Sequence, residues 1–241
     1  MRYHPSEKKM VTKQRITELP NSVQKWLLNS GIIGKEVIRS VFLQQDLQIK
    51  MKPGQDVWYN ANAKQYFTIE PPAFKWTLNL RINSFISLAG RDILENGKGA
   101  MSIKLFSIIP LVDVKDNSKI NQATLQRYLA EIVWFPSAAI NPNIKWEPID
   151  GNSAKATMSY GGTMGSGTFY FSKNGDFVKF GALRYKDVKE NSEPILWTVT
   201  AIKTEERNGI RIPVELKADW KLENGNWTWL KLKIKEINYD T

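Results

Sequence analysis

Two side chains four residues apart, Arg127 and Glu131, have types and a spacing that suit chemistry. On a helix this spacing puts both on one face, where a guanidinium and a carboxylate pair. A carboxylate can also work as an acid or base with a second carboxylate across a cleft. Two interpretations follow: an exposed intrahelical ion pair, or half of a hydrolase site. The second carboxylate would come from the remaining candidates, which are Glu70, Asp92, Glu95, Asp113, Glu147 and Asp150.

Other kinds of catalytic site are largely excluded by composition. The chain has no cysteine, and its one histidine is His4, close to the N-terminus where nothing would hold it against a nucleophile. The glycine-rich run 161–167 lacks a following lysine and helix, which a phosphate-binding loop needs. We therefore expect no metal site and no cofactor, and interpret the glycine run as a connecting loop.

The chain is basic, with 34 Lys and Arg against 24 Asp and Glu and a net charge of +10. This balance favours anionic partners such as a phospholipid surface. Near the C-terminus, basic and aromatic residues alternate on one predicted strand face. We favour the structural interpretation, a solvated outer sheet face whose lysines oppose edge-to-edge strand pairing. Nucleic acid is not expected as a partner, because one strand pair offers no groove. This face comprises Lys217, Lys221, Trp227, Trp229, Lys231, Lys233 and Lys235.

Four Asn-Gly pairs predict the elements that must position these side chains. Asn and Gly tolerate the positive φ of a tight hairpin turn, so each pair predicts two antiparallel strands. Two helices are expected, at 21–29 and at about 121–134 with Asn121 as its cap. A sheet of roughly ten strands must curl. The sequence therefore predicts a mainly β fold: a strongly curved antiparallel half-barrel with two or three helices on its concave side.

The last Asn-Gly pair, at 224–225, needs an odd loop, most simply three residues with a bulge. A two-residue turn would place charged and apolar residues on the same face. With the odd loop, Trp220 and Leu230 are buried together, and Lys231 and Lys233 are exposed.

The chain reads as one domain over residues 19–241, since no linker interrupts the strand pattern, preceded by a flexible tail over residues 1–18. The N-terminal segment has neither the apolar stretch of a signal peptide nor the length of a membrane span. A cytoplasmic location is the default expectation, and membrane association stays open.

Several segments resemble an uncharacterised bacterial family of unknown function, from about Leu19 to Tyr239. The most specific segment is 127–136, which reads RYLAEIVWFP; the others are 105–110, 145–150 and 184–185. More distantly, the arrangement of elements resembles the bacterial lipoprotein-carrier (LolA/LolB-like) half-barrel, whose helices close over an apolar cavity. That resemblance is architectural and implies a fold, not a function.

The leading hypothesis is a non-enzymatic binding or carrier protein that holds a lipid or other hydrophobic ligand in the concave face, with the second helix as a lid. The alternatives are a hydrolase that uses Glu131 with a second carboxylate, and a structural or partner-binding domain. Arg127 and Glu131 are the polar candidates. The predicted apolar lining is Trp76, Leu80, Phe85, Phe106, Leu129, Trp134, Phe135 and Trp146.

Overall fold

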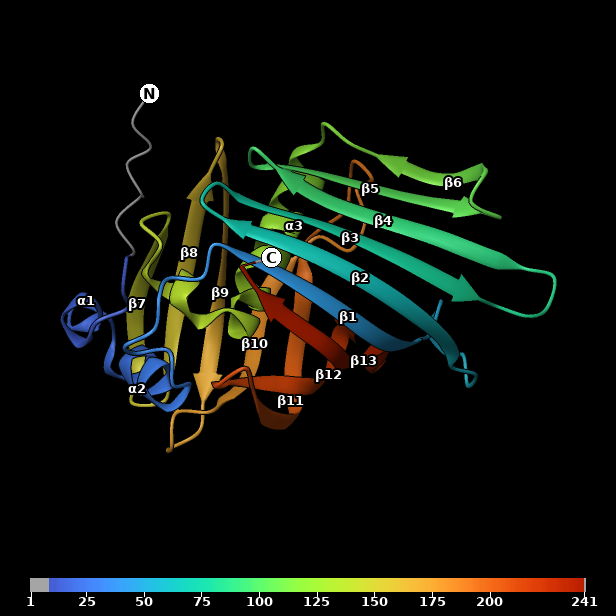
Figure 1. Cartoon of the computed structure of the whole chain (residues 1–241). Helices are drawn as coiled ribbons and strands as arrows, with labels where there is room; N and C mark the ends of the chain where they lie inside the picture. Colours follow the sequence, from blue (N-terminus) through green and yellow to red (C-terminus); the bar gives the residue numbers. More distant parts are fainter. Residues whose placement is uncertain (1–8, 241) are drawn as a thin grey trace, which may run out of the picture.

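The computed structural model describes residues 9–240, in which thirteen antiparallel strands form one curved sheet (Figure 1). This confirms the predicted fold class, a mainly β half-barrel. The strands are β1 (Ser40–Ile49), β2 (Tyr59–Ile69), β3 (Pro72–Arg81), β4 (Ser87–Glu95), β5 (Lys98–Leu105), β6 (Ile109–Val114), β7 (Ile144–Asp150), β8 (Ser153–Tyr160), β9 (Thr163–Phe171), β10 (Phe177–Arg184), β11 (Ile195–Arg207), β12 (Ile210–Leu222) and β13 (Gly225–Tyr239).

The sheet is built from two meanders that meet in its middle. Strands β1 to β6 run outward to one edge, and β7 to β13 run back from the other edge until β13 pairs with β1. The chain crosses between the edges through α3 (Ser118–Glu131) and two 3₁₀ helices, η1 (Ile132–Trp134) and η2 (Pro136–Ile140). The crossing places α3 against both arms, where it contacts β5 and β9.

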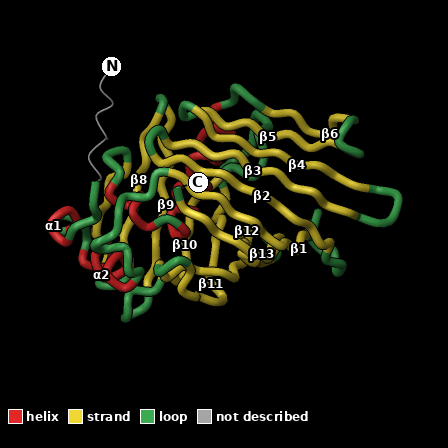
Figure 2. The backbone as a smooth tube through the Cα atoms, viewed as in Figure 1, coloured by secondary structure: helices red, strands yellow, loops and turns green. Residues whose placement is uncertain are grey.

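The remaining helices are α1 (Lys13–Ile16) and α2 (Asn21–Asn29), and the second matches its predicted range. Figure 2 shows the helices gathered toward one end of the molecule, while the turns at the far end of β1–β6 have none. We call that far end the open end. No helix within residues 9–240 is long and apolar enough to cross a membrane.

The second predicted helix differs from α3 at both ends. Asn117, not Asn121, is the cap, and its side chain accepts a hydrogen bond from the Lys119 amide at 2.8 Å. Asn121 instead accepts from the Gly99 amide at 2.8 Å, which ties the helix to β5. The α-helix ends at Glu131 and continues as the 3₁₀ turn η1, because Pro136 lies just ahead and cannot extend an α-helix.

Two glycines let α3 approach both arms of the sheet closely. A Cβ on Gly99 would lie 2.7 Å from the Ile120 carbonyl oxygen, and one on Gly165 would lie 2.8 Å from Gln126 Cγ. A larger residue at Gly99 would have to move the helix backbone, and one at Gly165 would have to displace the Gln126 side chain. The glycine-rich run therefore lies in the β8–β9 hairpin and β9 rather than in a loop, and part of it serves close packing.

Residues 9–18, assigned by the sequence to a flexible tail, are packed against the domain; residues 1–8 lie outside the described part. Val11 and Ile16 are buried, and the Val11 amide donates to the Lys35 carbonyl at 2.9 Å. Met10 also forms a bridge with Glu36. The expected flexible tail is therefore wrong for residues 9–18. Local sequence does not reveal their packing, because their partners Lys35 and Glu36 lie more than twenty residues away.

The C-terminal hairpin reaches part of the expected burial, with a different turn. Leu222 pairs with Gly225, so the turn has two residues, and the register shifts between Ala218 and Asp219 instead. Trp220 is buried and Lys231 and Lys233 are exposed, as predicted, but Leu230 is only half-buried. The same bulge turns Trp227 and Trp229 toward the core, so their assignment to the lysine face was wrong.

Candidate functional site

Arg127 lies at the centre of an inner polar cluster between α3 and the sheet. Its Nε donates to Glu131 Oε1 at 2.9 Å, and its Nη1 donates to Asp92 Oδ2 of β4 at 2.5 Å. The three side chains are only 15%, 13% and 21% exposed. The intrahelical pair exists, but it faces the interior instead of solvent.

Two buried amides extend this cluster to β1 and β2. Gln65 Nε2 donates to Glu131 Oε2 at 2.8 Å, and Gln45 Nε2 donates to Gln65 Oε1 at 3.1 Å. Trp76 Nε1 donates to Gln45 Oε1 at 3.0 Å, so the indole is the last member of this series of hydrogen bonds. The inner polar cluster thus comprises Arg127, Glu131, Asp92, Gln65 and Gln45, with Trp76 attached.

The electrostatics of this cluster are balanced around Arg127. Burial raises the pKa of Glu131, while the adjacent Arg127 and the hydrogen bond from Gln65 act in the opposite direction. The guanidinium lies over the rings of Trp76 and Phe74, at 4.7 and 5.1 Å from their centroids. Both Glu131 oxygens accept hydrogen bonds, so the cluster fastens α3 to β2 and β4. Asp92 is the second carboxylate in contact with Arg127, so it is the candidate partner for Glu131 in a hydrolase. That alternative function stays a prediction.

A row of tryptophans crosses the inner face of the other arm. Trp197 of β11 pairs with Trp220 of β12, which pairs with Trp227 of β13, and Trp229 follows at the bulge. We call these four residues the tryptophan row. Arg184 of β10 lies over it, 4.7 Å from the Trp197 ring centroid and 5.6 Å from that of Trp220. The sequence does not predict this group: it places Trp227 and Trp229 on the lysine face, and only the register aligns tryptophans from separate strands.

Beyond α3, the inner face toward the open end is apolar. Six buried side chains from β1, β2, β3 and β4 form a distal apolar cluster, separate from the main core. Trp76, Trp229, Leu230 and Leu232 pack against it. Its buried members are Leu47, Ile49, Ala61, Ala63, Leu80 and Leu88.

The turns at the open end and the start of β6 carry exposed apolar side chains, which we call the apolar rim. The β3–β4 and β5–β6 turns are joined by a hydrogen bond from the Phe106 amide to the Ser87 carbonyl at 2.9 Å. Leu88 and Leu105, which follow and precede these turns, pack in or against the distal apolar cluster. The rim comprises Phe85, Ile86, Phe106, Ile108, Ile109 and Leu111.

The structure distributes the eight predicted lining residues over three regions. Leu129, Trp134 and Phe135 are buried in the main core, where Phe67 lies 4.8 Å from the Phe135 ring centroid. Trp146 is half-buried against the same core, and Trp76 touches both clusters. Leu80 belongs to the distal apolar cluster, while Phe85 and Phe106 belong to the rim. Of these regions, the distal apolar cluster and the rim are adjacent along β4 and β5, through Leu88 and Leu105.

A groove of ≈ 1250 Å³ crosses this part of the molecule, and its lining mixes polar side chains with Leu47, Ala61, Leu80 and Leu88 of the distal apolar cluster. Its charged lining residues come from β1, β3, β12 and β13. Several lysines there are paired: Lys233 with Glu215 at 3.2 Å and Lys217 with Asp219 at 3.3 Å. These ion pairs neutralise part of the basic face that the sequence predicts near the C-terminus.

Comparison with known proteins places the chain in a family. The model of the Family of unknown function (DUF6544) matches residues 9–232. No curated protein matches the chain significantly. Among solved structures it is similar to a LolA superfamily protein from Nitrosomonas europaea, at 10% identity over 91% of this chain and 94% of that chain, with a TM-score of 0.41. A beta-barrel-like protein of domain of unknown function DUF1849 from Brucella abortus is also similar, at 11% identity over 85% of this chain and 99% of that chain, with a TM-score of 0.28.

Proposed function

The chain belongs to this family of unknown function, and we propose that it binds a lipid or other hydrophobic ligand in the concave face of its sheet. The ligand would lie along the distal apolar cluster, between the open end and the tryptophan row. The helix α3 closes the opposite end of this space through the inner polar cluster.

The apolar rim is the observation that carries the proposal. Phe85 is 85% exposed and Ile108 is 77% exposed, although phenylalanine and isoleucine side chains are among those most often buried. The two turns that hold them are hydrogen-bonded neighbours, so the exposed residues gather at one site. A gathered apolar surface of this kind marks a place where a protein meets a ligand, a membrane or a partner.

Continuity with the interior favours a ligand over a flat partner surface. Leu88 lies immediately after the first turn and is a buried member of the distal apolar cluster. Leu105 lies immediately before the second turn and packs against the same cluster. An acyl chain that enters at the rim would therefore remain in contact with apolar side chains as far as Trp76 and Trp229.

A binding experiment with a fluorescent fatty-acid probe tests the proposal. Replacing Phe85 and Phe106 together with serine should weaken probe binding by about tenfold or more, since each ring would bury area worth roughly 1 kcal/mol against the ligand. Melting temperature should hardly change, because both side chains are exposed.

The matched control is Leu28→Ser, which removes an exposed apolar side chain from α2, at the other end of the molecule (Figure 1). Its probe affinity should equal that of the parent. Failure of the parent to bind any apolar probe would contradict the proposal, as would equal losses in the rim variant and the control.

A further inference from the structure

The tryptophan row holds hydrogen-bond donors that lack acceptors. The Nε1 atoms of Trp197, Trp227 and Trp229 are buried, and none has a hydrogen-bond partner within residues 9–240. Trp197 as a whole is only 5% exposed. A buried indole N–H without an acceptor is destabilising, so three such groups on one strand arm need an explanation.

Arg184 adds a cation to the same face. Its Nε donates to the Ala123 carbonyl at 2.9 Å, but its terminal amino groups make no hydrogen bond and no ion pair within the described part of the chain. Burial lowers the pKa of Arg184 to about 10, and the nearby Arg127 adds to this effect. Asp92 and Glu131 also lie within electrostatic range of Arg184, yet both are already paired with Arg127. Among the residues that the structure describes, Arg184 is thus a partly buried cation that has no counter-ion in contact.

We infer that Arg184 and the tryptophan row bind the acidic head group, a carboxylate or a phosphate, of an amphipathic ligand. This inference rests on the proposed function, because it fixes the polar end of the same ligand. A group that only accepts hydrogen bonds matches a surface that only offers donors. Trp229 connects the two ends, since it packs against both the main core and the distal apolar cluster. The head group therefore lies at Arg184, and the apolar chain runs toward the open end.

The test compares two probes that differ only at the head: a fluorescent long-chain fatty acid and the matching fatty alcohol. The parent should bind the acid about 10- to 100-fold more tightly, which is the range expected for hydrogen bonds to a charged group. An alkyl phosphate of equal chain length, used as a competitor, tells a carboxylate site from a phosphate site.

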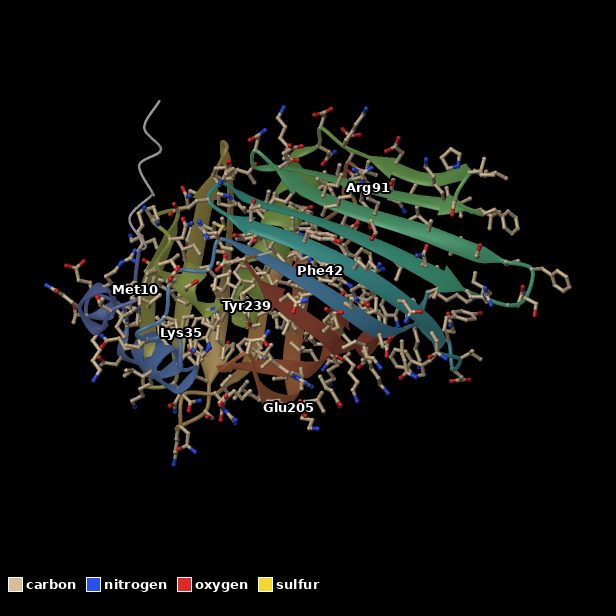
Figure 3. All side chains as sticks on the ribbon, viewed as in Figure 1. Met10, Lys35, Phe42, Arg91, Glu205 and Tyr239 are labelled. Atoms are coloured by element: carbon tan, nitrogen blue, oxygen red, sulfur yellow. The ribbon has the colours of Figure 1, made fainter. Side chains whose placement is uncertain are left out.

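Two variants and a control locate the effect. Arg184→Gln should lose most of the preference for the acid and keep its affinity for the alcohol. Trp197→Phe keeps a ring but removes one donor, so it should weaken the acid several-fold and leave the alcohol unchanged. The control Arg91→Gln removes one positive charge from the exposed outer face of β4, where Figure 3 labels Arg91, and should retain the full preference.

The outcomes separate the two proposals. Equal binding of acid and alcohol by the parent overturns the head-group inference but leaves the proposed function intact. Absence of binding for both probes overturns both. If Arg184→Gln does not fold, the head-group inference is still tested by the affinities of the parent and of Trp197→Phe for the acid and the alcohol. An unchanged acid preference in Arg91→Gln confirms that net charge is not the cause.

Discussion

Trp134 should contribute to stability as a core residue, and its replacement by alanine tests this directly. The side chain is 3% exposed, and its Nε1 donates to the Pro213 carbonyl at 3.1 Å. The Phe67 ring lies 6.4 Å away between centroids, and Tyr239 donates to the Trp134 carbonyl at 2.9 Å. These surroundings join η1 to β2, β12 and β13.

The expected loss follows from these contacts. Removing a buried aromatic side chain lowers the free energy of unfolding by about 3 to 5 kcal/mol, and the unpaired Pro213 carbonyl adds about 1 kcal/mol. For a chain of this size each kcal/mol lowers the melting temperature by about 2 to 4 °C. Trp134→Ala should therefore melt roughly 8 to 24 °C below the parent.

Urea unfolding followed by circular dichroism measures this loss. Phe85→Ala is the matched control, because it truncates an aromatic side chain that is 85% exposed and should change stability by less than about 0.5 kcal/mol. At temperatures where Trp134→Ala is folded, it should bind an apolar probe as the parent does. A stable variant that loses probe binding would refute the reasoning and make Trp134 a ligand contact.

Two further predictions concern the position of α3. Gly99→Ala should lower the free energy of unfolding by about 1 to 3 kcal/mol, since its Cβ would meet the α3 backbone, whereas Gly151→Ala, with open space around it, should be nearly neutral in thermal unfolding. The raised pKa of Glu131 means that its contribution to stability is fully present below its usual value of 4.5 and is lost as the pH rises through the higher folded value. Urea unfolding from pH 4 to pH 8 should therefore show this loss in the parent and not in Glu131→Gln; identical pH profiles would contradict it.

Turn chemistry explains how much of the fold the sequence predicts. All four Asn-Gly pairs join antiparallel neighbours in the sheet. At Asn96-Gly97 and Asn208-Gly209 both residues have positive φ, and the two-residue turn has the expected register. At Asn174-Gly175 and Asn224-Gly225 only the glycine has positive φ, and a bulge between the two paired strands shifts the register. A bulge depends on packing across the sheet, so the local sequence does not predict it.

The candidate site was predictable only where its spacing is local. The four-residue spacing of Arg127 and Glu131 predicts their ion pair. Its burial depends on Gln65 and Asp92, which lie 66 and 35 residues from their partners in the cluster. The tryptophan row and Arg184 come from four strands whose alignment only the folded sheet provides. The resemblance of segment 184–185 to the family implies no role for Arg184.

Native mass spectrometry of the purified protein tests the central claim most directly. We expect, beside the 27.7 kDa chain, a second species heavier by the mass of one lipid. Extraction with organic solvent should remove that mass, and a fatty acid added to the stripped protein should restore an adduct in the parent but less of it in the Phe85 and Phe106 double variant. A single species at the chain mass, which takes up no apolar ligand after extraction, would contradict the account.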